Sequence, residues 1–218
     1  MIAHASKLSE RVQLLVSNNR QHIIKTNRDP LALAYWTIVF EHHNGILTLL
    51  RNGNPTSAYS LLRVLEEAFL KLFLVMFGTE KQLRSISNGE YNTDFVAVGK
   101  QIDEKMGVEP MVGPRFKGRI GMLHGLTHNG PEQVMKQLSK QTREVGPTYS
   151  DKEIRALVQE TMPVVFMAGA FMTEFLNLPV ENATALQMFD EYVELQLQSL
   201  NIDDTITKIE TASRAAGQ

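Results

Sequence analysis

The stretch from Pro55 to Phe77 constrains the fold more than any other part of this chain. Asn54 is a favourable N-cap residue, Pro55 suits the first position of a helix, and Gly78 is a typical helix stop. Between these signals, apolar side chains cover nearly the whole circumference of the expected helix. A helix that is apolar on almost every side is normally buried. The stretch therefore predicts the central helix of a bundle.

Helical periodicity continues through most of the chain, and no segment shows the alternation of polar and apolar residues that is typical of a strand. The other predicted helices cover residues 5–25, 30–51, 79–89, 93–106, 115–128, 131–141, 150–176 and 182–200, followed by a short tail that begins at Asp203 or Asp204. Capping signals mark three of the starts: Asp29-Pro30, Thr79 with Gln82, and Ser150 with Glu153. No Gly/Ser linker and no repeat divides the 218 residues. The sequence predicts an all-α, single-domain helical bundle over residues 1–218, with its core at about 30–200.

Composition excludes several functional classes. The net charge of -2 argues against a strongly basic nucleic-acid-binding protein, and the lack of cysteine excludes disulfides and thiolate metal sites. We expect no signal peptide and no membrane span, because the longest apolar run, Met162 to Met172, is too short and contains Pro163. We find no motif for a nucleotide, a dinucleotide, calcium or a serine nucleophile. We therefore expect a cytoplasmic protein without a cofactor.

Three charged residues form a single polar stripe on the central helix. Arg63, Glu67 and Lys71 follow one another at four-residue spacing. If buried, they must be paired, since an unpaired buried charge is very costly. One interpretation is a structural ion network, and the other is a polar pocket in which Arg63 anchors an anion. We expect the stripe to face His128. His42 or His43 is a further candidate partner for the stripe.

A histidine pair is the second candidate site. His124 and His128 are four residues apart, so they share one face of the predicted helix. Glycines beside them weaken a helix by roughly 1 kcal/mol each relative to alanine, so another factor must favour them. These glycines are Gly118, Gly121 and Gly125. They indicate either close approach of another backbone or access of a ligand to the histidines.

Charge is distributed unevenly along the second half of the chain. Basic residues predominate from Arg115 to Arg143, and acidic residues predominate from Glu181 to Asp204. Either the two segments attract each other, within one chain or across a dimer, or the basic segment faces a polyanion such as RNA.

The spacing Arg119-x4-His124 resembles the signature of the HEPN ribonucleases. These are small all-helical proteins in which paired Arg and His, usually at a dimer interface, cut RNA without a metal. The resemblance implies a HEPN-like fold, a homodimer, and attack by a ribose 2′-OH with His as general acid or base. Arg119 and His124 point about 140° apart on one helix, so they would not converge within one chain. Lys117 lies nearly on the face of His124 and is a second candidate cation.

A wider resemblance links three segments, Ser57–Ala68, Leu126–Gly130 and Pro147–Ile154. Their sequences are similar to the motifs S-A-x-x-L-x-R-P-x-x-E, T-H-G-G and P-x-Y-x-x-E-E of a bacterial family of helical proteins of unknown function. The match covers roughly residues 35–180 and implies a polar cluster of Arg, Glu and His. The positions that it marks are Arg63, Glu67, Lys71, Thr127, His128 and Gly130. The chain departs from the family at Val64, Lys71 and Asn129, which stand where the family has Pro, commonly Arg, and Gly.

Three functional classes therefore stay open. The first is a metal-independent endoribonuclease of toxin or defence type that uses His124 and His128 with Arg119 and Lys117, acts as a homodimer on RNA, and is controlled by a regulatory protein partner. The second is a non-catalytic binding or assembly module whose polar cluster holds the fold or an anion. The third is a metal-dependent helical-bundle enzyme. Its metal would be held by the histidine pair with Glu67, or by the group Glu41, His42 and His43.

Overall fold

The computed structural model describes residues 1–19, 26, 28–107, 109–128, 130–138 and 145–196. Its named helices are α1 (Ile2–Ser17), α2 (Asp29–Arg51), α3 (Pro55–Phe77), α4 (Glu80–Ser87), α5 (Phe95–Met106), α6 (Val112–Thr127), α7 (Pro131–Met135) and α8 (Asp151–Phe175), and residues 179–196 are also helical. No strand occurs in these ranges, which confirms the predicted all-α class.

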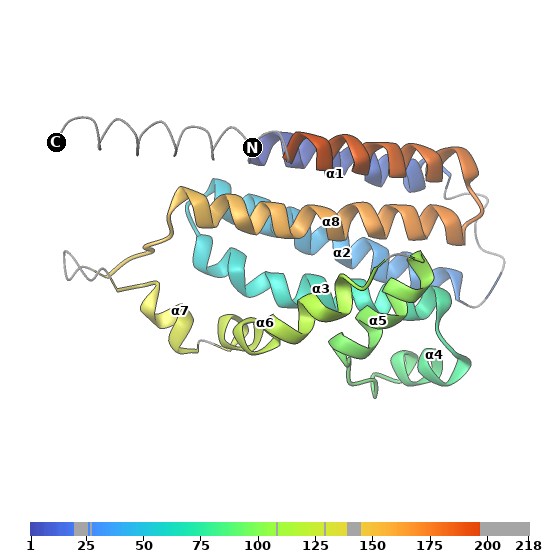
Figure 1. Cartoon of the computed structure of the whole chain (residues 1–218), viewed down its shortest axis with the longest axis horizontal. Helices are drawn as coiled ribbons and strands as arrows, with labels where there is room; N and C mark the ends of the chain where they lie inside the picture. The colour runs from blue at the N-terminus through green and yellow to red at the C-terminus, as the bar shows by residue number, and fades with distance from the viewer. Residues whose placement is uncertain (20–25, 27, 108, 129, 139–144, 197–218) are drawn as a thin grey trace.

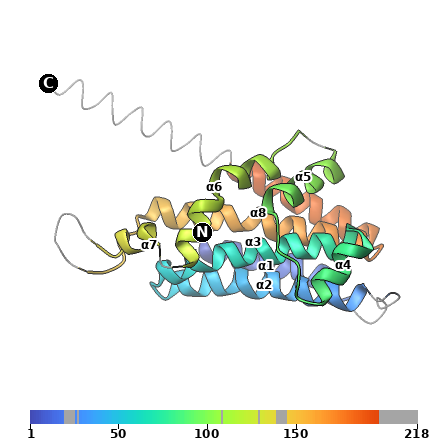
Figure 2. The same ribbon diagram turned by 90° about the horizontal axis from the view of Figure 1, so that it is seen from below.

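The long helices lie side by side around α3 (Figures 1 and 2). Helix α3 packs against α2, α8 and α6, and it also contacts α4 and α5. Helix α1 lies on the far side of α8 and α2 and contacts both. Most of α3 is buried, including Leu62, Leu65, Phe69, Leu72 and Phe73. The expected central position of α3 is therefore confirmed.

The capping signals place most helix ends correctly. Thr79 with Gln82 and Ser150 with Glu153 each form a complete capping box. The predicted start of α2 at Asp29 is also confirmed. Asn54 is the N-cap residue of α3, but its side chain makes no capping hydrogen bond. The first helix was expected to reach residue 25, but α1 ends at Ser17 and residues 18–19 form a turn. Residues 20–25 of the expected helix lie outside the described residues. The tail expected after Asp203 or Asp204 lies outside the described residues.

A side chain of α5 fixes the start of α6. The Asp103 carboxylate is buried and accepts hydrogen bonds from the backbone N–H groups of Met111, Val112 and Gly113, at 2.8 to 3.0 Å. Burial raises the pKa of this carboxyl, but the three hydrogen bonds outweigh it, so the pKa lies below its usual value. The backbones also cross closely, since a Cβ on Gly99 would lie 2.8 Å from the Gly113 Cα. These contacts set the direction of α6 along α3.

Helix α8 is the single candidate for a membrane span among the described helices, by length and composition. Of its most apolar window, 67% is buried inside the protein. That burial is what a core helix of a bundle requires, because its apolar side chains pack against α1, α2 and α3.

Candidate functional site

The structure brings Arg63 of α3 together with both histidines at the end of α6. The Arg63 Nη1 atom lies 3.0 Å from His124 Nδ1 and 3.2 Å from His128 Nε2. The two imidazole rings are stacked, with centroids 5.4 Å apart and planes inclined by 28°. Both histidines are exposed, and Arg63 is half-buried. We call these three side chains the Arg–His site.

The Arg–His site fixes the tautomers of its histidines. A guanidinium has only donors, so each ring nitrogen that faces Arg63 must accept. In the neutral rings the protons therefore reside on Nε2 of His124 and Nδ1 of His128, the two nitrogens that do not face Arg63.

Polar contacts one turn before Arg63 hold the end of α6 against α3. The Ser60 hydroxyl donates to the Leu126 carbonyl oxygen at 3.0 Å, and it accepts from the Gln133 amide at 2.6 Å. The Gln133 amide also donates to the Thr56 carbonyl oxygen at 3.3 Å. These contacts position the α6–α7 corner that carries His128. Ser60 and Gln133 were not predicted as part of the site, because nothing in a local sequence pattern marks a side chain that bridges two helices.

The remaining marked positions do not join the Arg–His site. Glu67 and Lys71 pair with each other at 2.8 Å. Within the described residues, Arg63 is therefore the one member of the polar stripe that contacts the histidines. The Thr127 hydroxyl donates to the Leu123 carbonyl oxygen of its own helix, at 2.9 Å. The Gly130 backbone N–H donates to the carbonyl oxygen of Gly125 at 2.6 Å, and this bond closes the turn after α6.

Arg119 faces away from the histidines and belongs to a separate ion cluster. Its guanidinium lies 3.2 Å from the buried Glu66 carboxylate and also pairs with Glu160. Arg115 pairs with Glu160 too, and its guanidinium is 3.9 Å from Glu66. The R-x4-H pair therefore does not converge within one chain, as the helical spacing required. Lys117 is exposed on α6 and makes no ion pair within the described part of the chain.

Glu66 was missed because it lies within the apolar face of α3. Its side chain is only 1% exposed, and burial raises its pKa to about 7, although Arg119 and Arg115 act in the opposite direction. Its neighbour Glu67 was predicted instead, because Glu67 continues the spacing of Arg63 and Lys71. The available signal was the position of Glu66 between Leu62 and Phe69, since a carboxylate on an apolar stripe must find buried cations.

The charge segments do not pair with each other in the described residues. The ion pairs of the basic segment run from Arg115, Arg119 and Lys136 to Glu66, Glu160 and Glu153. The partners thus lie on α3 and α8, outside the acidic segment. Two of the three glycines beside the histidines, Gly118 and Gly121, show no close packing, because a Cβ on either would meet nothing within 4 Å.

The second histidine group lies elsewhere. His43 is fully buried in α2, and burial lowers its pKa to about 4. His42 is half-buried, and its pKa is lowered by burial, with a smaller opposing effect of Glu41. Neither residue contacts the Arg–His site in the parts of the chain that the structure describes. Within those parts, no group of three His, Asp or Glu side chains is arranged to hold a metal ion.

The three segments of the wider resemblance meet around one turn of α3. Besides the contacts of Ser60 and Arg63, the Tyr59 hydroxyl donates to the Glu153 carbonyl oxygen at 2.7 Å, and its ring stacks on Tyr149 at 4.9 Å. Lys136 pairs with Glu153 and lies over the Tyr149 ring.

Comparison of the chain with models of known protein families, with curated proteins and with solved structures finds no match. The function is therefore inferred from the geometry of the site.

Proposed function

We propose that the Arg–His site binds a phosphodiester of RNA and cleaves it without a metal ion. The observation that supports this is the position of Arg63, which lies within hydrogen-bond distance of two exposed imidazoles. A guanidinium matches the oxygens of a phosphate, and imidazoles can donate and accept protons near neutral pH. In this proposal Arg63 takes the role that the R-x4-H resemblance gives to Arg119.

The chemistry would be an attack of the ribose 2′-oxygen on the adjacent phosphorus. One histidine accepts the 2′-OH proton, and the other donates a proton to the 5′-oxygen as the P–O5′ bond breaks. The products are a 2′,3′-cyclic phosphate and a 5′-hydroxyl. Arg63 stabilises the charge that develops on the non-bridging oxygens. A cytoplasmic location, a homodimer and a regulatory partner protein are parts of the same proposal.

The test is cleavage of a single-stranded RNA by the purified protein in the presence of EDTA. We expect His124→Ala and His128→Ala each to slow cleavage by roughly 10²- to 10⁴-fold, the usual contribution of a general acid or base. His4→Ala is the matched control, because His4 is exposed on α1 and lies outside the site. Retention of wild-type cleavage by both site variants would overturn the assignment.

A second candidate function is anion binding without cleavage. The stacked rings of His124 and His128 come from one end of one helix, so both approach a ligand from the same side. In-line cleavage needs a base and an acid near opposite sides of the phosphorus. Binding of a non-cleavable 2′-deoxy oligonucleotide that Arg63→Gln weakens, together with intact RNA in every sample, would favour this second function.

A further inference from the structure

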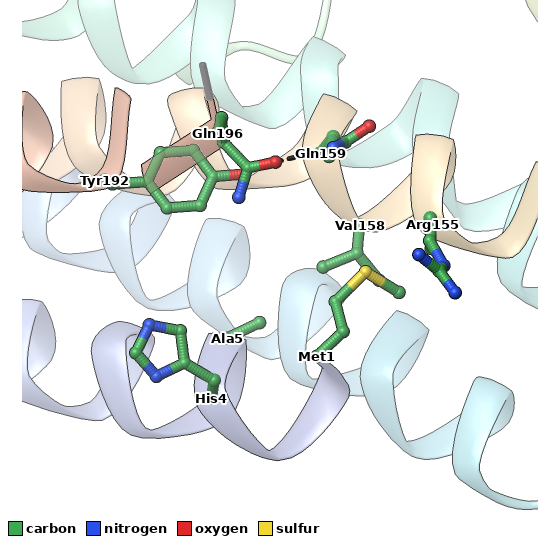
Figure 3. A pocket seen from close by; sticks show the side chains of 8 residues that line it. All are labelled: Met1, His4, Ala5, Arg155, Val158, Gln159, Tyr192 and Gln196. Atoms are coloured by element: carbon green, nitrogen blue, oxygen red, sulfur yellow. Dashed lines mark hydrogen bonds between the residues drawn. The ribbon is translucent and has the colours of Figure 1, made fainter. Parts of the chain in front are cut away.

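A pocket of about 520 Å³ lies between α1, α8 and helix 179–196. None of these elements contributes to the Arg–His site. Its volume is within the range of pockets that hold small organic molecules, roughly 300–1,000 Å³. Figure 3 shows the side chains of Tyr192 and Gln196 on one side of the pocket and those of His4 and Met1 on the other, with Val158 between them.

The middle of the pocket is apolar. Ala5 and Val158 are buried, and the side chain of Met1 also lines the pocket. The Tyr192 ring adds a further apolar surface. A hydrocarbon chain or ring placed here would lose its contact with water, which stabilises binding by roughly 25 cal/mol per Å² of apolar surface.

The charged groups around the pocket have one sign. Arg155 is exposed on α8 and makes no ion pair or hydrogen bond with another described residue. His4 also lines the pocket, and no Asp or Glu is among the described residues that line it. The remaining polar lining is an amide pair, in which Gln159 donates to the Gln196 oxygen at 2.5 Å. The local charge therefore favours an anion over a cation.

A buried hydroxyl in the pocket wall is the second observation. Tyr192 is only 7% exposed, and its hydroxyl has no hydrogen-bond partner among the described residues. Burial also raises the pKa of Tyr192 to about 12. A buried hydroxyl without a partner costs roughly 1–3 kcal/mol, and a ligand that turned the Tyr192 side chain toward the pocket and bonded to its hydroxyl would remove that cost.

We propose that this pocket binds a small organic anion with an apolar body, a monocarboxylate whose carboxylate pairs with Arg155 and whose hydrocarbon part lies on Ala5, Val158 and the Tyr192 ring. A second site of this kind makes the protein a binder of a small amphipathic acid, independently of any action on RNA.

The test is calorimetric titration of the full chain with decanoate, decanol and decyltrimethylammonium, each below its critical micelle concentration. We expect saturable binding of one decanoate per chain and at least tenfold weaker binding of the alcohol and the cation. Equal affinity for the three probes, or no saturable binding of decanoate, would overturn the proposal.

One variant and one matched control locate the carboxylate. Arg155→Gln should weaken decanoate binding about tenfold and leave decanol binding unchanged, because it removes only the charge partner. Arg11→Gln is the control, since Arg11 is exposed on α1 outside the pocket. Circular dichroism should show the same helix content for all three proteins. Equal decanoate affinity in the Arg155 and Arg11 variants would show that the anion binds elsewhere.

Discussion

Two buried residues, His43 and Glu66, give opposite pH dependences to the stability of this protein. Burial lowers the pKa of His43 from 6.5 to about 4, and it raises the pKa of Glu66 from 4.5 to about 7. Each difference corresponds to about 3 kcal/mol between the two protonation states. The titrations overlap, so we expect their effects on the free energy of unfolding to cancel over much of the acidic range.

The signs follow from which state binds more protons. As the pH falls from 6.5 to about 4, the unfolded chain binds a proton at His43 that the folded chain does not, so the His43 contribution to stability is lost. As the pH rises from 4.5 to about 7, the folded chain keeps a proton on Glu66 that the unfolded chain releases, so the Glu66 contribution is lost. Each slope is about 1.4 kcal/mol per pH unit, and the two slopes oppose each other.

Replacing one of the two residues should reveal the pH dependence of stability that the other one causes. With Glu66→Gln, the free energy of unfolding should rise by about 2 kcal/mol relative to the wild-type profile between pH 4.5 and 6.5, because of these two residues only His43 still contributes. With His43→Leu it should fall by a similar amount. The leucine loses no hydrogen bond within the described residues, because neither ring nitrogen of His43 has a partner there. In the double variant, the free energy of unfolding should change with pH as steeply as in the wild type.

Urea denaturation at half-unit pH steps from 4.5 to 6.5 measures all four proteins. Other carboxyl groups titrate in the same range, but they do so equally in each protein, so the differences isolate the two residues. Parallel profiles for the wild type and the Glu66 variant would refute the raised pKa of Glu66. Parallel profiles for the wild type and the His43 variant would refute the lowered pKa of His43.

Four further substitutions test helix packing and helix capping, each by chemical denaturation. Gly121→Ala should stabilise the protein by up to about 1 kcal/mol, because the new methyl group meets only open space. Equal or lower stability would contradict this. Asp103→Ala should cost about 2–4 kcal/mol, since three backbone N–H groups at the start of α6 lose their acceptor, and a smaller loss would mean that water replaces it. Gly169→Ala should cost about 1–3 kcal/mol, because the new methyl group would lie 2.3 Å from a Val12 methyl, whereas a neutral result would mean that α1 shifts easily. Ser150→Ala should cost about 1 kcal/mol through loss of the capping box, and an unchanged midpoint would contradict it.

Local signals were sufficient to predict much of the fold. The bounds of α3 follow from Pro55, Gly78 and the apolar run between them, all of which act within a few residues. The capping boxes at Thr79 and Ser150 likewise need only neighbouring atoms. The predicted end of the first helix was wrong, because the helical periodicity of the sequence continues past Ser17, whereas residues 18–19 form a turn.

The site could be predicted only in part, because its geometry depends on how two helices cross. The sequence placed Arg63 on one helix and both histidines on one face of another. Whether those faces meet depends on the direction of α6, which Asp103 of α5 determines from outside the motif. The choice of Glu67 over Glu66 had a similar cause. A regular charge spacing describes one helix, whereas buried ion pairs depend on its neighbours.

The most direct test of the Arg–His site is analysis of the RNA ends that the wild type and Arg63→Gln produce in EDTA. Arg84→Gln is the matched control, because Arg84 lies on α4 and outside the site. We predict 2′,3′-cyclic phosphate ends with the wild type and the Arg84 variant, and at least about a hundredfold fewer with the Arg63 variant, as expected when a charge-stabilising donor is lost. Equal amounts of cyclic phosphate from all three proteins, or no cleavage by the wild type, would contradict the proposed ribonuclease.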